Sequence, residues 1–283
     1  MIRRLRKNHP IGYCVAAEVI FLAVILLVSL VVTVGLVLVL DDLSGVEDYL
    51  VTAVQEAAGI LVAVLLLKTT GRLSLLRRRG SGFFNGLLVG MYPVAIIGYN
   101  LYSRLLFGLP QDMPLRAGWR IASYVVGLSL VGVAEEFIFR AVIGQTLLEH
   151  FGTSRSGIWK ACILSGVLFG AAHLTNLAGS AAFGVLMQCV FAASLGVMLT
   201  AIYYRTGNIW VVAFIHAAMD LTSMLAGGLY GTESVAESVS GYDATMLFSV
   251  LIYLLPTLFL LRKKKLGEVA LYFGRDIPAE KRA

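Results

Sequence analysis

Eight long stretches of mainly apolar residues follow one another along the chain and constrain its fold more than any other feature. Most are close to or above the roughly 20 apolar residues that a helix needs to cross a bilayer. Hydrophobic residues make up 58% of the sequence and charged residues 14%, against roughly 25% charged residues in a soluble domain. The sequence therefore predicts an all-α polytopic membrane protein with about eight transmembrane helices, in one transmembrane domain over residues 1–283. The predicted spans are 11–40, 49–67, 83–102, 119–148, 157–175, 181–204, 208–228 and 244–261.

Lysines and arginines gather at one end of this predicted bundle. Eight crossings put both termini on the same side, and 19 of the 23 basic residues fall on that side. The opposite side has only Arg104, Arg116 and Arg120. Because cytosolic segments of membrane proteins carry the excess of basic residues, the pattern predicts cytosolic termini and a short basic cytosolic tail over 262–283. It also predicts a multi-pass protein of the cell membrane, in contact with membrane lipids.

The charge distribution also excludes a class of partner. A net charge of +6 could indicate nucleic-acid binding, but the basic residues stand between apolar runs as topology determinants, so no nucleic-acid partner is predicted. The three cysteines lie inside apolar runs and form neither a disulfide framework nor a metal-ligand spacing.

Three charged side chains stand inside the predicted span 119–148: Glu135, Glu136 and Arg140. The run 121–133 before them has no charged residue. A charged side chain at the bilayer centre costs at least roughly 2.5–3.5 kcal/mol, so such residues mark functional sites. The four-residue spacing favours an ion pair between Glu136 and Arg140. Glu135 lies about 100° round the helix and is predicted to be the working carboxylate.

Two other predicted spans carry ionisable groups at a similar depth. His173 lies in the fifth span, and His216 and Asp220 lie on one face of the seventh. Counted at about 1.5 Å per residue from the ends near the termini, these groups and Glu135 fall in one central band. A carboxylate beside an imidazole in a partly desolvated pocket can take a proton from water. The sequence therefore predicts a site for water activation between the helices.

These residues resemble the signature of a known family, the CPBP group of intramembrane proteases. That group includes the type II CAAX prenyl endopeptidases and the bacteriocin self-immunity proteins. The resemblance covers residues 119–225, and the eight predicted helices agree with the prenyl endopeptidases. Its three motifs are Glu135-Glu136-x-x-x-Arg140, Phe169-x-x-x-His173 and His216-x-x-x-Asp220.

The resemblance implies hydrolysis of a peptide bond within the membrane, in a membrane-associated or lipidated substrate. The residues matching Glu135 and His173 would activate a water molecule. Those matching His216 and Asp220 would hold the oxyanion or, in a metalloprotease, help to bind a metal such as Zn²⁺. The implied catalytic residues are Glu135, Glu136, Arg140, His173, His216 and Asp220, and the possible metal ligands among them are Glu135, His173, His216 and Asp220.

Asp220 departs from the pattern, because the prenyl endopeptidases usually have Asn at this position. An amide can donate a hydrogen bond to an oxyanion, whereas an ionised carboxylate repels it. Asp220 is therefore expected to be protonated, to bind a metal or to orient His216.

Other interpretations remain open at this stage. The charges could form a structural ion network, the protein could be a non-catalytic immunity or scaffold protein, or it could be an ion-coupled transporter. The intramembrane acids Glu18 and Glu56 have no assigned role, and packing partners or a water-filled cavity are expected for them. The site itself is expected to open towards the cytosol, the side of the termini.

Overall fold

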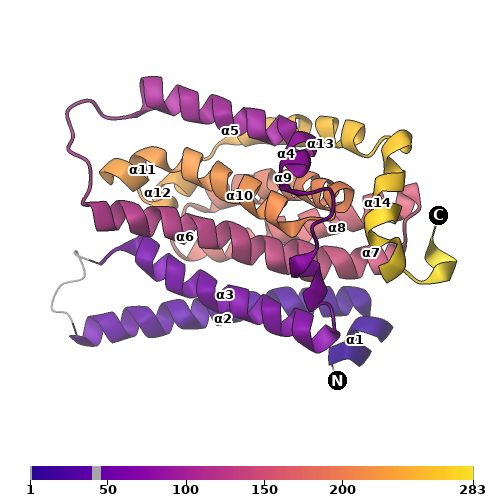
Figure 1. Cartoon of the computed structure of the whole chain (residues 1–283). Coiled ribbons are helices and arrows are strands. Elements are labelled where there is room, and N and C mark those ends of the chain that lie inside the picture. Colours follow the sequence, from indigo (N-terminus) through magenta and orange to yellow (C-terminus); the bar gives the residue numbers. More distant parts are fainter. Residues whose placement is uncertain (1, 40–45, 283) are drawn as a thin grey trace.

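The computed structural model describes residues 2–39 and 46–282, and these residues form helices and no strand. The helices make an elongated bundle in which α1 and α14 lie at the same end (Figure 1). The predicted all-α polytopic fold is therefore confirmed. The α-helices are α1 Ile2–Asn8, α2 Pro10–Val39, α3 Asp48–Thr70, α4 Phe83–Val89, α5 Met91–Ser103, α6 Gly118–Glu136, α7 Gln145–Phe151, α8 Arg155–Ala172, α9 Ala182–Thr206, α10 Ile209–Ser223, α11 Leu225–Tyr230, α12 Val235–Ser240, α13 Phe248–Leu260 and α14 Leu266–Phe273. The tighter or wider turns are η1 Leu73–Arg77, η2 Arg104–Gly108, η3 Phe137–Gly144, η4 His173–Ala178, η5 Ala244–Leu247, η6 Lys263–Lys265, η7 Gly274–Asp276 and η8 Ala279–Lys281.

The membrane spans overlap the predicted ranges, but two bends between helices were not predicted. Among the described residues, four helices are long and apolar enough to cross a membrane: α2, α3, α8 with η4, and α9. Two bent pairs raise this number to six, one bent by 84° between α4 and α5 and one by 63° between α13 and the tail. The first pair is the predicted span 83–102, interrupted at Gly90. Residue 40, the end of the first predicted span, lies outside the described residues. The total of eight spans and the cytosolic termini stay predictions.

Glycines bring the central helices into backbone contact, because small residues let the backbones of membrane helices approach closely. A Cβ atom added at Gly132 in α6 would lie 2.7 Å from the backbone nitrogen of Ala217 in α10. A Cβ atom added at Gly170 in α8 would meet the backbone of α9, and one at Gly196 would lie 2.9 Å from the Phe169 ring. The close α6–α10 contact places the first and third motifs side by side, and Gly196 lets α9 pack closely against Phe169 of the second.

The helix that carries the charged motif changes its winding at the motif. α6, η3 and α7 run on without a break from residue 118 to 151, and the η3 segment is π-helical. Every residue from 136 to 148 is buried. The bundle is therefore closed on the side of the site where α7 leads towards the termini. π-helical turns within α-helices occur frequently at functional sites, and the sequence analysis did not foresee this one.

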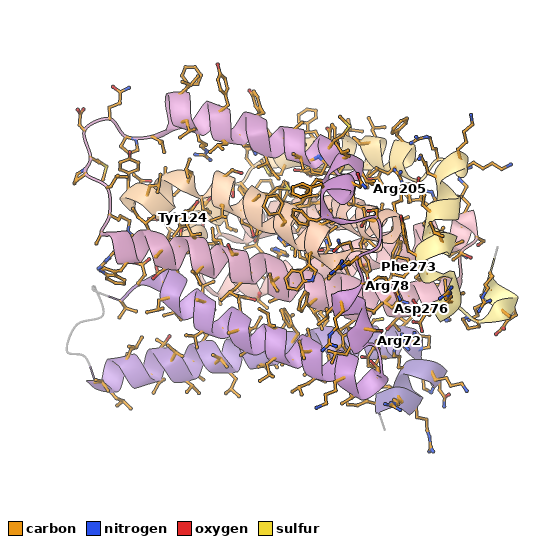
Figure 2. All side chains as sticks on the ribbon, viewed as in Figure 1. Arg72, Arg78, Tyr124, Arg205, Phe273 and Asp276 are labelled. Atoms are coloured by element: carbon orange, nitrogen blue, oxygen red, sulfur yellow. The ribbon has the colours of Figure 1, made fainter. Side chains whose placement is uncertain are left out.

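The basic tail packs against the bundle, although the sequence analysis predicted only a cytosolic tail there. Asp276 accepts hydrogen bonds from Arg72 and Arg78 at 3.2 and 2.7 Å. Phe273 is buried against Tyr203, and the Arg78 guanidinium lies 5.0 Å from the Phe273 ring centroid. Figure 2 shows Arg72, Arg78, Phe273 and Asp276 at the end of the bundle where α14 lies, with Tyr124 at the other end. The tail therefore helps to close the end that carries the termini.

Candidate active site

The structure brings all six predicted site residues together from three segments of the chain. Glu135 and Glu136 end α6 and Arg140 follows in η3, His173 follows α8, and His216 and Asp220 lie one turn apart on α10. The Nε2 atom of His216 lies 3.5 Å from Glu135 Oε2 and 3.6 Å from Asp220 Oδ2. His216 is therefore the side chain around which the charged groups converge.

Glu136 holds the His216 ring in position from the buried side of the site. Its side chain has no exposed surface, and its Oε1 accepts a hydrogen bond from His216 Nδ1 at 2.9 Å. Its Oε2 lies 3.0 Å from Arg140 Nε, which is the predicted ion pair, although the angle does not make it a hydrogen bond. Because an ionised carboxylate only accepts, Nδ1 of His216 carries the proton. The Nε2 atom is thereby turned towards Glu135 and Asp220.

His173 is oriented by a backbone carbonyl. Its Nδ1 lies 2.9 Å from the carbonyl oxygen of Phe169, one turn earlier in α8. A carbonyl oxygen accepts only, so Nδ1 carries the proton, and Nε2 of the neutral ring is left as an acceptor. Since His173 lines the site cavity, this tautomer is the one that can take a proton from water.

The Phe169 ring packs against three of the polar groups of the site. Its ring meets the rings of His173 and His216 edge to face, at centroid distances of 5.0 and 5.6 Å. The Arg140 guanidinium lies 4.5 Å from the same ring. A cation over an aromatic face is stabilised by the ring quadrupole, most strongly where water is excluded. One side chain therefore fixes the positions of two imidazoles and a buried cation.

Replacing Phe169 with leucine is expected to lower the turnover number about 10-fold and the thermal midpoint by only a few degrees. The leucine fills much of the space, but it removes ring contacts worth about 0.5–1.5 kcal/mol each and leaves both imidazoles less constrained. The measurement is the rate of peptide cleavage with the unfolding midpoint of the same preparation in detergent. An unchanged rate would show that the ring does not position the site.

The site opens into a cavity of about 390 Å³. Glu135, His173, His216 and Asp220 line it, and so does Glu56 of α3, for which either packing partners or a water-filled cavity was expected. Some of the remaining lining residues come from α6, η3, α8, α9 and α10, and most come from α2, the start of α3, η4 and α12. These segments continue from the site towards the end of the bundle that carries α11 and α12 (Figure 1). The expectation that the site opens towards the termini is wrong, because the buried residues 136–148 close that side.

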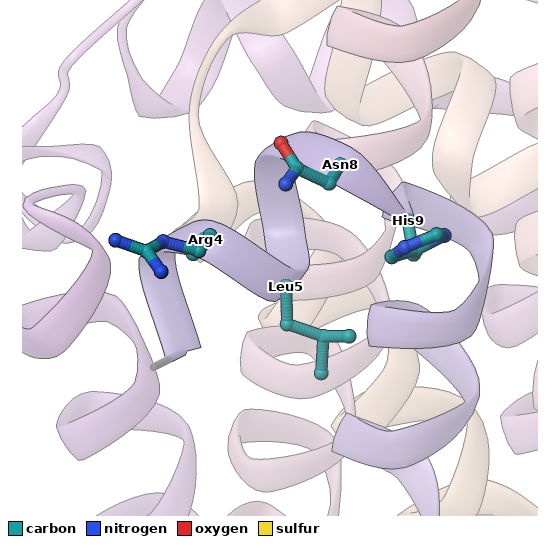
Figure 3. A pocket seen from close by; sticks show the side chains of 4 residues that line it. All are labelled: Arg4, Leu5, Asn8 and His9. Carbon is teal, nitrogen blue, oxygen red and sulfur yellow. The ribbon is translucent and has the colours of Figure 1, made fainter.

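A second hollow lies away from the site. It surrounds the junction of α1 and α2 and is lined by Arg4, Leu5, Asn8 and His9 (Figure 3). None of the motif residues lines it. The hollow next to the ionisable groups is therefore the one relevant to chemistry.

The side chains as placed do not complete a metal centre. The separations of His216 Nε2 from Glu135 and Asp220 are close to the ~3.3 Å between neighbouring ligand atoms of tetrahedral zinc. Across residues 2–39 and 46–282, however, no group of three or more His, Cys, Asp or Glu residues is arranged to hold a metal ion. No step of the chemistry below is therefore routed through a metal.

Two features of the cavity were missed in the sequence. Glu56 had no assigned role because it stands alone in α3, far from the motifs in the chain. The second feature is a pair of amides, in which Asn176 Nδ2 of η4 donates to Gln188 Oε1 of α9 at 2.8 Å. Asn176 follows His173 by three residues, and this short spacing was the available signal for it.

Comparison with known proteins bears directly on these residues. Residues 117–222 match the family model described as type II CAAX prenyl endopeptidase Rce1-like. No curated protein and no solved structure gave a significant match to the chain. The matched segment contains all six site residues and lies within a multi-pass helical bundle. Proteins of this family are membrane-embedded peptidases that act on peptide or lipidated substrates. Residues 117–222 are therefore similar to the type II CAAX prenyl endopeptidase Rce1-like family, which supports the predicted resemblance to the CPBP group of intramembrane proteases.

Proposed function

We propose that the protein is an intramembrane endopeptidase in which Glu135 is the general base. The observation that supports this most is that two adjacent carboxylates differ in burial and in their partners. Glu136 is fully buried between His216 and Arg140, whereas the side chain of Glu135 is 20% exposed in the cavity, beside His216 Nε2. One acid is held as a fixed anchor, and its neighbour is free to meet water.

In the proposed reaction, a water molecule in the cavity loses a proton to Glu135, with Nε2 of His173 as a further acceptor. The resulting hydroxide adds to the carbonyl carbon of the substrate and forms a tetrahedral oxyanion. His216 acts here as an imidazolium: Nδ1 donates to Glu136, and the second proton, on Nε2, is donated towards that oxyanion, an interaction often worth about 3–4 kcal/mol. The proton held by Glu135 then passes to the leaving amine as the C–N bond breaks, which gives a carboxylic acid and an amine. The acid loses its proton to Nε2 of His173 and leaves as a carboxylate.

Asp220 has a different proposed role from the usual Asn. Its Oδ2 lies 3.6 Å from His216 Nε2, and its side chain is 30% exposed. An ionised carboxylate there repels an oxyanion and attracts the proton on Nε2. We therefore assign Asp220 to hold the His216 proton between turnovers, and the oxyanion to His216 itself.

The test is the Glu135→Gln variant, which keeps the shape of the side chain and removes the base. Cleavage is expected to fall by about 10²–10⁴-fold, the usual contribution of general acid–base catalysis. The thermal midpoint should stay unchanged, because Glu135 faces the cavity. The probe is a membrane fraction from cells that lack the protein, incubated with the purified protein in H₂¹⁸O. New peptide termini and ¹⁸O in the new carboxylates are read by mass spectrometry.

Two outcomes of this experiment would remove the proposal. Cleavage retained by Glu135→Gln would mean that another group activates the water. No new termini with the wild-type protein, together with ion flux into proteoliposomes, would favour the transporter interpretation.

A further inference from the structure

The cavity extends from the site mainly in one direction. On α6, the lining residues Leu128 and Val131 precede Glu135; on α10, Ser223 follows Asp220, and Met224 comes directly after the helix. Of the residues after Glu135 in η3 and α7, Phe139 alone lines the cavity, one turn away. α6 begins at the end of the bundle that α10 approaches as it ends (Figure 1). Both helices therefore line the cavity with the half that points away from α1 and α14.

The other elements around the cavity repeat this asymmetry. α3 contributes residues from its first nine positions only, between Tyr49 and Glu56. α8 contributes its last residue, Ala172, before η4. α12 belongs wholly to the connection between α10 and α13 at the same end. The cavity is open towards this end and closed towards the other.

The open and closed ends of the bundle also differ in charge. The closed end carries the basic segments before α2, around η1, after α7 and in the tail, together with Arg205 at the end of α9, and these hold 19 of the 23 lysines and arginines. The open end carries acids of the connecting segments, among them Glu47, Asp48, Glu233, Glu237 and Asp243. An excess of basic residues marks the cytosolic side of a membrane protein. The closed end is therefore the one that the charge rule places in the cytosol.

We propose that this protease takes its substrate from the extracytosolic side of the membrane. The inference rests on the proposed peptidase function and adds the side of entry and the class of substrate. The substrate is a membrane-anchored peptide segment at the extracytosolic leaflet. A cytosolic lipidated C-terminus does not fit, since its path to Glu135 runs through the buried residues 136–148.

The walls of the cavity suit such a segment. One wall is apolar and comes from α2, with Leu22, Ile25 and Leu26. Another wall presents the amide pair of Asn176 and Gln188, in which one hydrogen bond is made internally at 2.8 Å. As placed, this pair keeps Asn176 Oδ1 and Gln188 Nε2 available, an acceptor and a donor that match the N–H and C=O of an extended peptide. The apolar wall is left for apolar side chains or a lipid chain of the substrate.

The side of entry is tested by labelling single cysteines in intact cells. The background is Cys189→Ser, because Cys14 and Cys162 are buried. Ser238→Cys places a thiol on α12 at the cavity, and the control Ser74→Cys places one on the exposed surface of η1 at the closed end. A membrane-impermeant maleimide is expected to label Ser238→Cys in intact cells, and Ser74→Cys only after permeabilisation. Labelling of Ser238→Cys only after permeabilisation would overturn the proposal, and so would labelling of both variants before it.

A second measurement links the labelled thiol to catalysis. Modifying Ser238→Cys in intact cells with a bulky impermeant reagent is expected to lower cleavage by at least 10-fold relative to the same variant before modification. An unchanged rate after complete modification would show that substrate does not pass α12. The labelling pattern does not depend on proteolysis, so it reports the side of entry even if Glu135→Gln retains activity. Failure of the proposed function and failure of this inference are thereby distinguishable.

Discussion

Replacing Glu136 with alanine is expected to abolish cleavage and to lower the free energy of unfolding by about 3–5 kcal/mol, the usual cost of breaking a buried ion pair. The carboxylate has no exposed surface and contacts both Arg140 Nε and His216 Nδ1. Without it, the Arg140 guanidinium is buried without its counter-ion, and the His216 ring loses its anchor. The thermal midpoint in detergent should fall on the order of 10 °C, as measured by intrinsic fluorescence.

Two further variants separate the structural and catalytic parts of this effect. Glu56→Ala removes another carboxylate that is buried at the same cavity, but its Oε2 has no hydrogen-bond partner among the described residues. Its midpoint should therefore stay near that of the wild type. The double change Glu136→Leu with Arg140→Met removes the buried pair together and should regain most of the stability without regaining cleavage. A double variant that cleaves would show that Glu136 acts only on stability.

Replacing Gly132 with alanine is expected to reduce turnover about 100-fold, because misplacement of catalytic groups by about 1 Å has an effect of this size. The added Cβ would lie 2.7 Å from the backbone nitrogen of Ala217 and 2.9 Å from the carbonyl oxygen of Ala213. Backbone atoms in a packed helix cannot turn aside, so α6 and α10 must separate. Ala217 follows His216 directly, and Gly132 is one turn before Glu136. The separation of the helices therefore lengthens the contact between Glu136 and His216.

The matched control is Gly118→Ala in the same helix. Nothing lies within 4 Å of a Cβ atom added at Gly118, so both the rate and the midpoint should match those of the wild type. For Gly132→Ala the midpoint is expected to fall by the equivalent of about 1–3 kcal/mol, the usual cost of overpacking. Steady-state cleavage kinetics and thermal unfolding measure the two effects. Normal turnover in Gly132→Ala would show that the site tolerates movement between the helices.

Features that depend on one segment of the chain could be predicted from the sequence, whereas contacts between distant segments could not. The motif residues could be found because a charge or an imidazole in an apolar span is costly, and the cost is visible in the sequence. The ion pair of Glu136 with Arg140 follows from helical spacing alone. The contact of Glu136 with His216 could not be predicted, because it joins residues 80 positions apart and depends on how closely Gly132 lets two helices approach.

The direction of the cavity shows the same limit. Hydropathy gives the depth of Glu135 in its span, but it does not tell which half of the bundle is filled with side chains. The continuous burial from Glu136 to Leu148 and the π-helical winding of η3 are results of packing by several helices. The bend at Gly90 and the docking of Phe273 against Tyr203 are also tertiary outcomes.

The sequence by itself determined that this chain is a helical membrane protein and which few residues carry its chemistry. Both follow from the free energy of placing apolar and charged groups in hydrocarbon. This free energy depends on the composition of each segment and not on its contacts with other segments. The tertiary structure alone decided which carboxylate is an anchor and which meets the cavity, and to which end of the bundle that cavity opens. These depend on contacts between distant segments, because close packing fills one side of the site with side chains and leaves the other open.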